Sequence, residues 1–87
     1  MSETQIMQEI TRHEKAAQVY LLERNQWNTK RLYHRCRGQY MHLQRLWHLH
    51  GMSHTASPKL AEEYEIAIYL QFTVEQEHGR PVQCEWA

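Results

Sequence analysis

The sequence predicts an α+β fold in which two long antiparallel helices, about residues 3–24 and 29–50, cover a C-terminal β-hairpin of about residues 64–76 and 81–86. In the first half of the chain, apolar residues recur at three- and four-residue steps, which is the period of a helix. From Tyr64 to Val74 they occupy every second position, which is the period of a strand. The length of 87 residues provides for one small domain.

The first predicted helix begins near Glu3, because Ser2 and Gln5 have the spacing of a capping box. Its apolar face is formed by Ile6, Ile10, His13, Ala17, Tyr20 and Trp27. A histidine on such a face is more often a core residue than a catalyst, so we expect His13 to be buried with a hydrogen-bond partner. Asn28 is the expected N-cap of the second helix.

The second predicted helix divides into an apolar and a basic half. At 100° per residue, one arc is expected to face the core, and it gathers Leu32, Tyr33, Cys36, Tyr40, Leu43, Leu46 and Trp47. The opposite arc carries Lys30, Arg31, His34, Arg35, Arg37, His42 and Arg45. No carboxylate on this helix can form an i,i+4 pair with these cations. Gly38 lies within the basic arc, and Gly51 is expected to end the helix.

The segment after Pro58 has two interpretations. Tyr64, Ile66, Ile68, Leu70, Phe72 and Val74 alternate with more polar residues, as in a half-buried strand, and a turn at Gly79 would lead to a return strand. The competing interpretation is a buried helix from Pro58 to Glu77 that is closed by Gly79, which makes the fold an all-α three-helix bundle. We favour the strand because a helix would scatter Ile66 and Phe72 around its cylinder.

A two-stranded hairpin is only marginally stable by itself, so it must pack on the helices or pair with another chain. The open edge of the first strand therefore predicts a homodimer through the hairpin edge, or docking onto a partner's sheet. Trp86 is the aromatic residue that we expect to be exposed as an interface anchor. Cys36 and Cys84 have no CxxC spacing and are expected to be reduced.

Charge is segregated along the chain although the net charge is zero. Between Glu23 and Glu62 there is no acidic residue, whereas this block holds seven Lys and Arg residues and five His residues. Residues 1–23, 24–61 and 62–87 carry formal charges of −2, +7 and −5. Cations crowded on one helix face are typical of surfaces that bind phosphates or acidic proteins. The alternative is a solvated face that is balanced by the acidic ends of the same chain.

These observations predict a small, non-enzymatic, cytoplasmic protein that binds nucleic acid through the basic arc of the second helix. The alternative is an adaptor or inhibitor that docks on an acidic protein surface, such as a phage- or plasmid-type modulator of a host nucleic-acid-processing enzyme. The sequence has no nucleophile elbow, phosphate-binding glycine loop or HExxH motif, so we expect no enzyme activity, no cofactor and no small-molecule substrate. No apolar run is long enough for a membrane span, and no membrane partner is expected.

Three histidines near Gly51 are candidate metal ligands, namely His48, His50 and His54. On a helix, the side chains of His48 and His50 point about 200° apart, so they could bind one ion only if the helix unwound. We therefore expect no metal site there.

Overall fold

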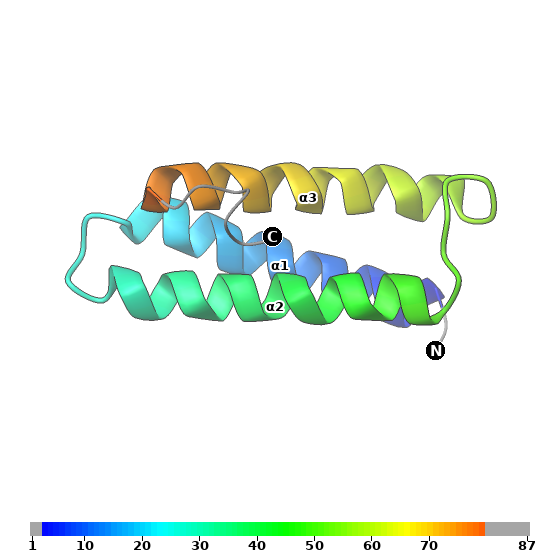
Figure 1. Ribbon diagram of the computed structural model, residues 1–87, viewed down its shortest axis with the longest axis horizontal. Coiled ribbons are helices and arrows are strands. Elements are labelled where there is room, and N and C mark those ends of the chain that lie inside the picture. Colours follow the sequence, from blue (N-terminus) through cyan, green and yellow to red (C-terminus); the bar gives the residue numbers. More distant parts are fainter. Residues whose placement is uncertain (1–2, 80–87) are drawn as a thin grey trace.

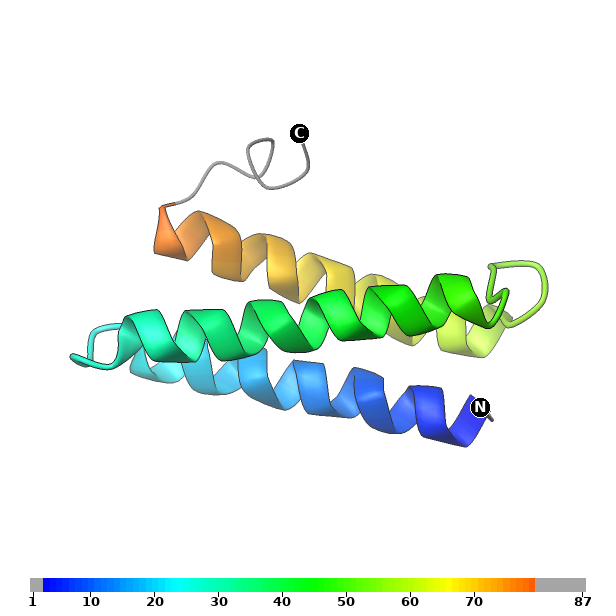
Figure 2. The same ribbon diagram turned by 60° about the horizontal axis from the view of Figure 1, so that its bottom comes forward.

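The computed structural model describes residues 3–79, which form a three-helix bundle in which consecutive helices are antiparallel (Figure 1). α1 spans Glu3–Glu23, α2 spans Thr29–Leu49 and α3 spans Pro58–His78. Figures 1 and 2 show the turn between α1 and α2 at one end of the bundle and the longer loop between α2 and α3 at the other. Each helix packs against the other two. The bounds predicted for the first two helices are confirmed to within one residue.

The predicted α+β fold is wrong, and the alternative of an all-α three-helix bundle is correct. Residues 3–79 contain no strand, and residues 64–76, predicted as the first strand of the hairpin, belong to α3. Residues 81–86, the predicted return strand, lie outside the described part of the chain. The predicted homodimer through a hairpin edge loses its basis, because the strand that would supply this edge is helical.

The alternating pattern was misleading because α3 buries polar residues and exposes apolar ones. Its buried positions recur at helical steps and are Leu60, Ala61, Tyr64, Ala67, Gln71, Val74 and Glu75. Ile66 and Phe72 are 46% and 44% exposed, although both were expected on the buried side of a strand. The helix has Pro58 in its first turn and ends at Gly79, whose φ of +82° is the left-handed conformation of a glycine C-cap.

The buried polar side chains of α3 are satisfied by α2. The Tyr33 hydroxyl donates to Glu75 Oε2 at 2.5 Å, and Gln71 Nε2 donates to Glu75 Oε1 at 2.6 Å. The Cys36 thiol donates to Gln71 Oε1 at 3.3 Å. We call Tyr33, Cys36, Gln71 and Glu75 the polar layer. Because each of these side chains has a partner, the layer avoids the cost of burying unpaired polar groups.

The apolar core consists of two clusters, one toward each end of the bundle. The first contains Ile6, Ile10, Leu43, Trp47, Leu60, Ala61, Tyr64 and Ala67. The second contains Ala17, Tyr20, Tyr33, Cys36 and Val74. His13 lies between them on α1, fully buried, with Nε2 3.1 Å from the Ala67 carbonyl oxygen. The prediction that His13 is a hydrogen-bonded core residue is therefore confirmed.

Candidate nucleic-acid interface

The outer half of α2 carries the cations that the sequence predicts as the binding site. Lys30, Arg31, His34, Arg35, His42 and Arg45 are exposed, and Arg37 is half-buried. α2 runs without interruption from Thr29 to Leu49, so helical periodicity alone holds these side chains on its outer half. Its sequence contains no Asp or Glu. We call this set of seven side chains the basic face.

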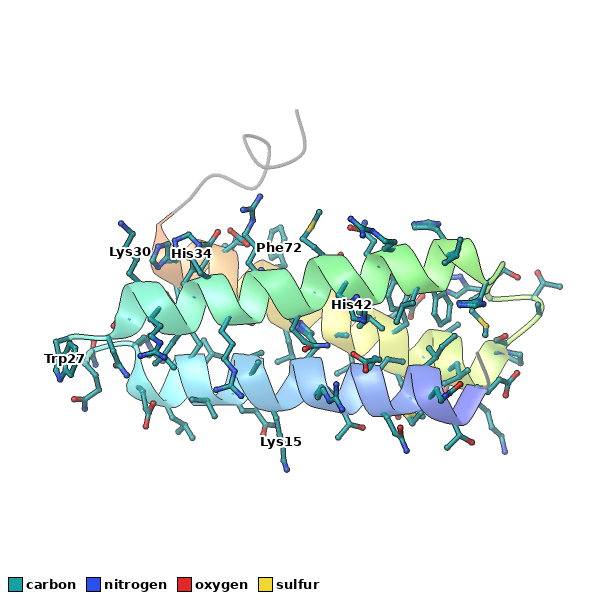
Figure 3. The ribbon with its side chains drawn as sticks, turned by 90° about the horizontal axis from the view of Figure 1, so that it is seen from below. Lys15, Trp27, Lys30, His34, His42 and Phe72 are labelled. Atoms are coloured by element: carbon teal, nitrogen blue, oxygen red, sulfur yellow. The ribbon has the colours of Figure 1, made fainter. Side chains whose placement is uncertain are left out.

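The basic face extends around the outside of α2, from the side near α1 to the side near α3. Figure 3 shows His42 on the side where α1 and α2 lie together, whereas Lys30 and His34 lie along the opposite edge of α2. Arg31 and Arg35 are one turn apart on α2, and Arg35 lines a groove shared with α1. Arg37 is the member that is partly covered by the fold. The seven residues therefore do not form one flat patch but wrap around half of the helix.

A groove between α1 and α2 adds two cations that sequence analysis did not assign to the site. It has a volume of about 300 Å³ and is lined by Arg12, Lys15, Ala16, Val19, Leu32, Arg35 and Gln39. Ala16, Val19 and Leu32 contribute apolar surface to its lining, and Arg12, Lys15 and Arg35 contribute charged groups. Within residues 3–79, neither Lys15 nor Arg35 forms an ion pair with a carboxylate. Lys15 therefore extends the basic face onto α1.

One carboxylate, that of Glu9, reaches the basic face from α1. Glu9 Oε2 accepts a hydrogen bond from Gln39 Nε2 at 2.8 Å, and its Oε1 is 3.2 Å from Arg12 Nη1. His42 Nε2 lies 3.8 Å from Glu9 Oε2. The expectation that no carboxylate neutralises the basic arc holds for α2 itself but fails at His42. Arg31 and Arg35, nearer the start of α2, have no such neighbour among the described residues.

Trp27 stands beside the basic face in the turn that joins α1 to α2. It is 95% exposed, so its predicted place on the apolar face of the first helix is wrong. The reason is that α1 ends at Glu23, where Gln26 N donates to the Glu23 carbonyl and the chain turns before helical periodicity reaches residue 27. Trp27 lines a surface hollow of about 430 Å³ together with Asn28, Lys30, Arg31 and His34. Figure 3 shows Trp27 projecting from the end of the bundle.

The Thr29 hydroxyl holds this turn in place. It lies 2.6 Å from the Arg24 carbonyl oxygen and 2.5 Å from that of Gln26. The turn also carries an ion pair between Arg24 and Glu77 of α3, with Nε and Oε2 3.2 Å apart. Trp27 is thus exposed on a turn that hydrogen bonds and an ion pair hold in place. An exposed indole ring on such a turn is suited to stacking against another flat ring.

The histidines near Gly51 do not assemble into a metal site. His48, His50 and His54 are all exposed, and His54 Nε2 lies 2.5 Å from Glu65 Oε1. No group of three His, Cys, Asp or Glu side chains within residues 3–79 has an arrangement that could hold a metal ion. Trp86, the predicted interface anchor, lies outside the described residues, as does Cys84.

The side chains of Cys36 and His13, which could in principle take part in catalysis, are buried in the core. Burial raises the pKa of the Cys36 thiol to about 12, with a smaller contribution from Glu75, whereas His34 points out from α2. Burial also lowers the pKa of His13 below 6.5, against the opposing effect of its hydrogen bond to the Ala67 carbonyl. A thiol that is neutral and buried is a poor nucleophile. Cys36 and His13 are therefore parts of the core rather than of an exposed reactive site.

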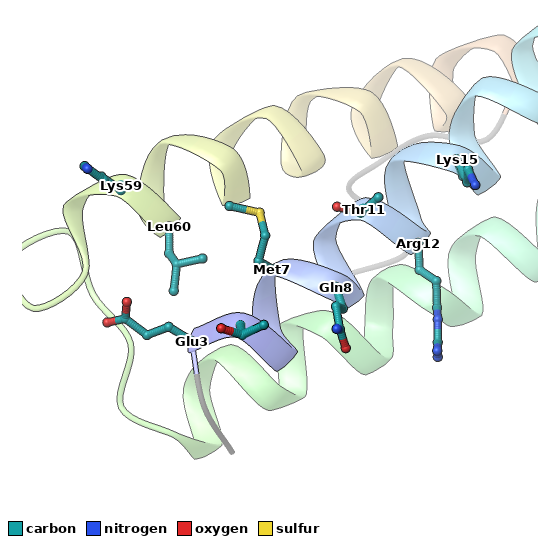
Figure 4. Close-up of a pocket in the computed structure, with 9 residues that line it drawn as sticks. Glu3, Met7, Gln8, Thr11, Arg12, Lys15, Lys59 and Leu60 are labelled. Carbon is teal, nitrogen blue, oxygen red and sulfur yellow. The ribbon is translucent and has the colours of Figure 1, made fainter.

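A wide, shallow hollow lies between the first half of α1 and the start of α3 (Figure 4). Its volume is about 760 Å³, and its lining includes Met7 and Leu60 as well as Glu3, Lys15 and Lys59. Figure 4 shows Met7 and Leu60 directed into the space between the two helices. The charges around this hollow are mixed in sign, so it does not continue the basic face.

No protein-family model, no curated protein and no solved structure matches this chain. Among the described helices, none combines the length and the apolar character that crossing a membrane requires.

Proposed function

We propose that this chain is a small, non-enzymatic, cytoplasmic protein that binds nucleic acid through the basic face of α2. The observation that carries the proposal is the run of exposed cations on a helix without a single carboxylate. Lys15 of α1 extends this run, and Glu9 of α1 approaches it at His42. Phosphate groups would neutralise Lys15, Arg31 and Arg35, which form no ion pair with a carboxylate within residues 3–79.

Two further features favour a single-stranded ligand over a duplex. Trp27 offers an exposed ring next to Lys30 and Arg31, and an unpaired base can stack on such a ring while the cations contact its phosphates. Stacking on one aromatic side chain contributes about 1–3 kcal/mol per base. The groove between α1 and α2 combines apolar side chains with the cations Lys15 and Arg35, which suits the unpaired bases and phosphates of a single strand better than a duplex, whose bases are stacked inside.

The test is a fluorescence-anisotropy titration of single-stranded and duplex DNA and RNA over a series of salt concentrations. With about four to six phosphates contacted, log K should fall with log[salt] at a slope of about −3 to −4 for single strands and about −4 to −5 for a duplex. Arg31→Glu and Arg35→Glu should each weaken binding and reduce this slope, because each removes a cation and adds a charge that repels phosphate.

Lys59→Glu is the matched control. Lys59 is also an exposed cation in the first turn of a helix, but it lies in α3 at the end of the bundle where α2 finishes. Lys59→Glu makes the same change in net charge as Arg31→Glu and Arg35→Glu. A purely non-specific effect of charge would therefore weaken binding equally in all three variants. Equal weakening, or no binding by the unaltered chain at low salt, would refute the proposal.

The second candidate function is a protein-docking adaptor or inhibitor. It is favoured by the exposed apolar side chains of α3, which binding to phosphates does not explain. In this case, polynucleotides would not bind, and Arg35→Glu would instead slow the association of an acidic protein partner.

A further inference from the structure

A hollow at the start of α2 brings one aromatic ring and three basic side chains together. Its volume is about 430 Å³, and it is lined by Trp27, Asn28, Lys30, Arg31 and His34. This volume is within the range of sites that bind small molecules, about 300–1,000 Å³. Lys30 and Arg31 are four and three residues before His34, so helical spacing makes the three side chains neighbours on one turn. Figure 3 shows Trp27 at the end of the bundle, with Lys30 and His34 following along α2.

The first turn of α2 also offers two backbone N–H groups. The N–H groups of Lys30 and Arg31 donate to no acceptor within residues 3–79. Asn28 is the N-cap, but its side chain forms no capping hydrogen bond, and its Oδ1 is buried without a partner. The turn contains no acidic residue that would occupy the positive end of the helix dipole. Donors and positive charge are therefore directed to the same place as the basic side chains.

Contacts within the bundle hold the groups around the hollow. The His34 ring packs edge-on against Tyr33, with ring centroids 5.4 Å apart and an interplanar angle of 67°. Tyr33 is itself fully buried and bonded to Glu75. On the other side of the hollow, hydrogen bonds of the Thr29 hydroxyl fix the turn that carries Trp27. A ligand therefore has less conformational freedom of the protein to remove when it binds.

The sign of the charge changes at this end of the bundle. The groove between α1 and α2 continues the positive surface away from the hollow. The end of the bundle itself carries the carboxylates of Glu23 and Glu77, in the last turns of α1 and α3. Arg24, the cation of the turn between α1 and α2, is paired with Glu77. A strand bound along α2 would therefore meet carboxylates if its backbone continued past Trp27, whereas a strand that ended there would not.

We propose that the hollow binds the phosphorylated end of a single strand, with the terminal base stacked on Trp27 and the terminal phosphate held by Lys30, Arg31 and the two backbone N–H groups. This inference rests on the proposed function and names the part of the nucleic acid that this end of the basic face recognises. A terminal phosphomonoester carries a charge of about −1.5 to −2, whereas an internal phosphodiester carries a single negative charge. The terminal group therefore accepts stronger hydrogen bonds from several donors and compensates more positive charge.

The experiment compares the affinity of the full chain for single-stranded oligonucleotides of one sequence that differ only at their ends. One carries a 5′-phosphate, one a 3′-phosphate and one hydroxyl groups at both ends, with a fluorophore on an internal base for anisotropy at constant salt. The strand with one of the two phosphates should bind at least about tenfold more tightly than both other strands, because charge-assisted hydrogen bonds are the strong ones. The two phosphorylated strands carry the same net charge, so a difference between them identifies the end and is not an effect of charge alone.

Two substitutions separate the hollow from the rest of the basic face. Lys30→Gln should bring the ratio of affinities for the preferred strand and the hydroxyl strand toward one, because Lys30 contacts the terminal phosphate. Arg35→Gln is the matched control, since Arg35 is an exposed cation of the same helix that does not line the hollow. This variant should weaken the binding of all three strands by the same factor and leave the ratio unchanged.

A second pair of variants tests the stacked base. Trp27→Ala should weaken the binding of the preferred strand, whereas Tyr69→Ala should not, although Tyr69 is also an aromatic residue with 71% exposure. Absence of binding by all three strands would refute the proposed function and this inference with it. Salt-dependent binding with equal affinity for the two phosphorylated strands would overturn the inference alone and leave the basic face as a site for internal phosphates. A preference for one end that Lys30→Gln leaves unchanged would also overturn it.

Discussion

Replacing Gly38 with alanine should stabilise this protein. Gly38 is in the interior of α2, and a Cβ built on it would have no atom within 4 Å. Glycine costs about 1 kcal/mol relative to alanine in a helix interior, because its unfolded backbone has more freedom to lose. We therefore expect the free energy of unfolding to rise by about 0.8–1 kcal/mol. For a domain of this size, this corresponds to an increase in Tm of about 4–8 °C.

Gly79→Ala is the matched control, because it makes the same chemical change with the opposite expected sign. A Cβ at Gly79 would also meet no atom within 4 Å, but the φ of this residue is +82°. An L-residue in this conformation costs about 1–2 kcal/mol, so Gly79→Ala should be destabilising. Urea unfolding followed by far-UV circular dichroism measures both variants, with the slope m expected to stay constant. A neutral or destabilising Gly38→Ala, or a stabilising Gly79→Ala, would refute this reasoning.

Three further predictions concern the buried polar groups. Burial lowers the pKa of His13 in the folded state, so as the pH falls below about 6.5 the unfolded chain binds a proton at this residue before the folded chain does. The free energy of unfolding should therefore fall by up to about 1.4 kcal/mol for each pH unit below about 6.5. Urea titrations at a series of pH values should show a smaller pH dependence in His13→Gln. Tyr33→Phe should lower the free energy of unfolding, measured by urea denaturation, by about 1–3 kcal/mol, because it removes the hydroxyl that donates a hydrogen bond to the buried Glu75 carboxylate. In a Cys84→Ser background, the Cys36 thiol should react with a disulfide reagent at pH 8 only after urea unfolds the chain, and rapid labelling of the native protein would contradict its burial.

Sequence periodicity predicts α1 and α2 correctly because both helices follow the ordinary rule of an apolar inner face and a polar outer face. α3 breaks this rule at Gln71 and Glu75, whose partners Tyr33 and Cys36 are supplied by another helix. Nothing in the sequence next to Gln71 and Glu75 indicates that the Cys36 thiol and the Tyr33 hydroxyl lie opposite them on α2. Pro58 and Gly79 do mark the two ends of α3, as the competing interpretation of this segment as a buried helix predicts.

The candidate site could be predicted in part for the same reason. The cations of α2 share a face by helical spacing, so their grouping can be read from one segment. Lys15 and Glu9 of α1 join or oppose them only through the packing of α1 on α2, which one-dimensional charge counting does not reveal. The exposure of Trp27 depends on where α1 stops, and the ends of helices are the least certain part of a prediction from periodicity.

The polar layer selects one of two ways in which α3 could pack. A rotation of α3 by about half a turn would bring the exposed side chains of Ile66 and Tyr69 toward the core. That rotation would also break the hydrogen bond between Tyr33 and Glu75 and move the Glu75 carboxylate to the solvent side. Tyr33 and Cys36 would then remain buried without acceptors. Unpaired buried groups of this kind cost about 1–3 kcal/mol each. The hydrogen bonds between α2 and α3 therefore act with the apolar core to set the rotation of the third helix, and with it which aromatic rings are exposed to solvent.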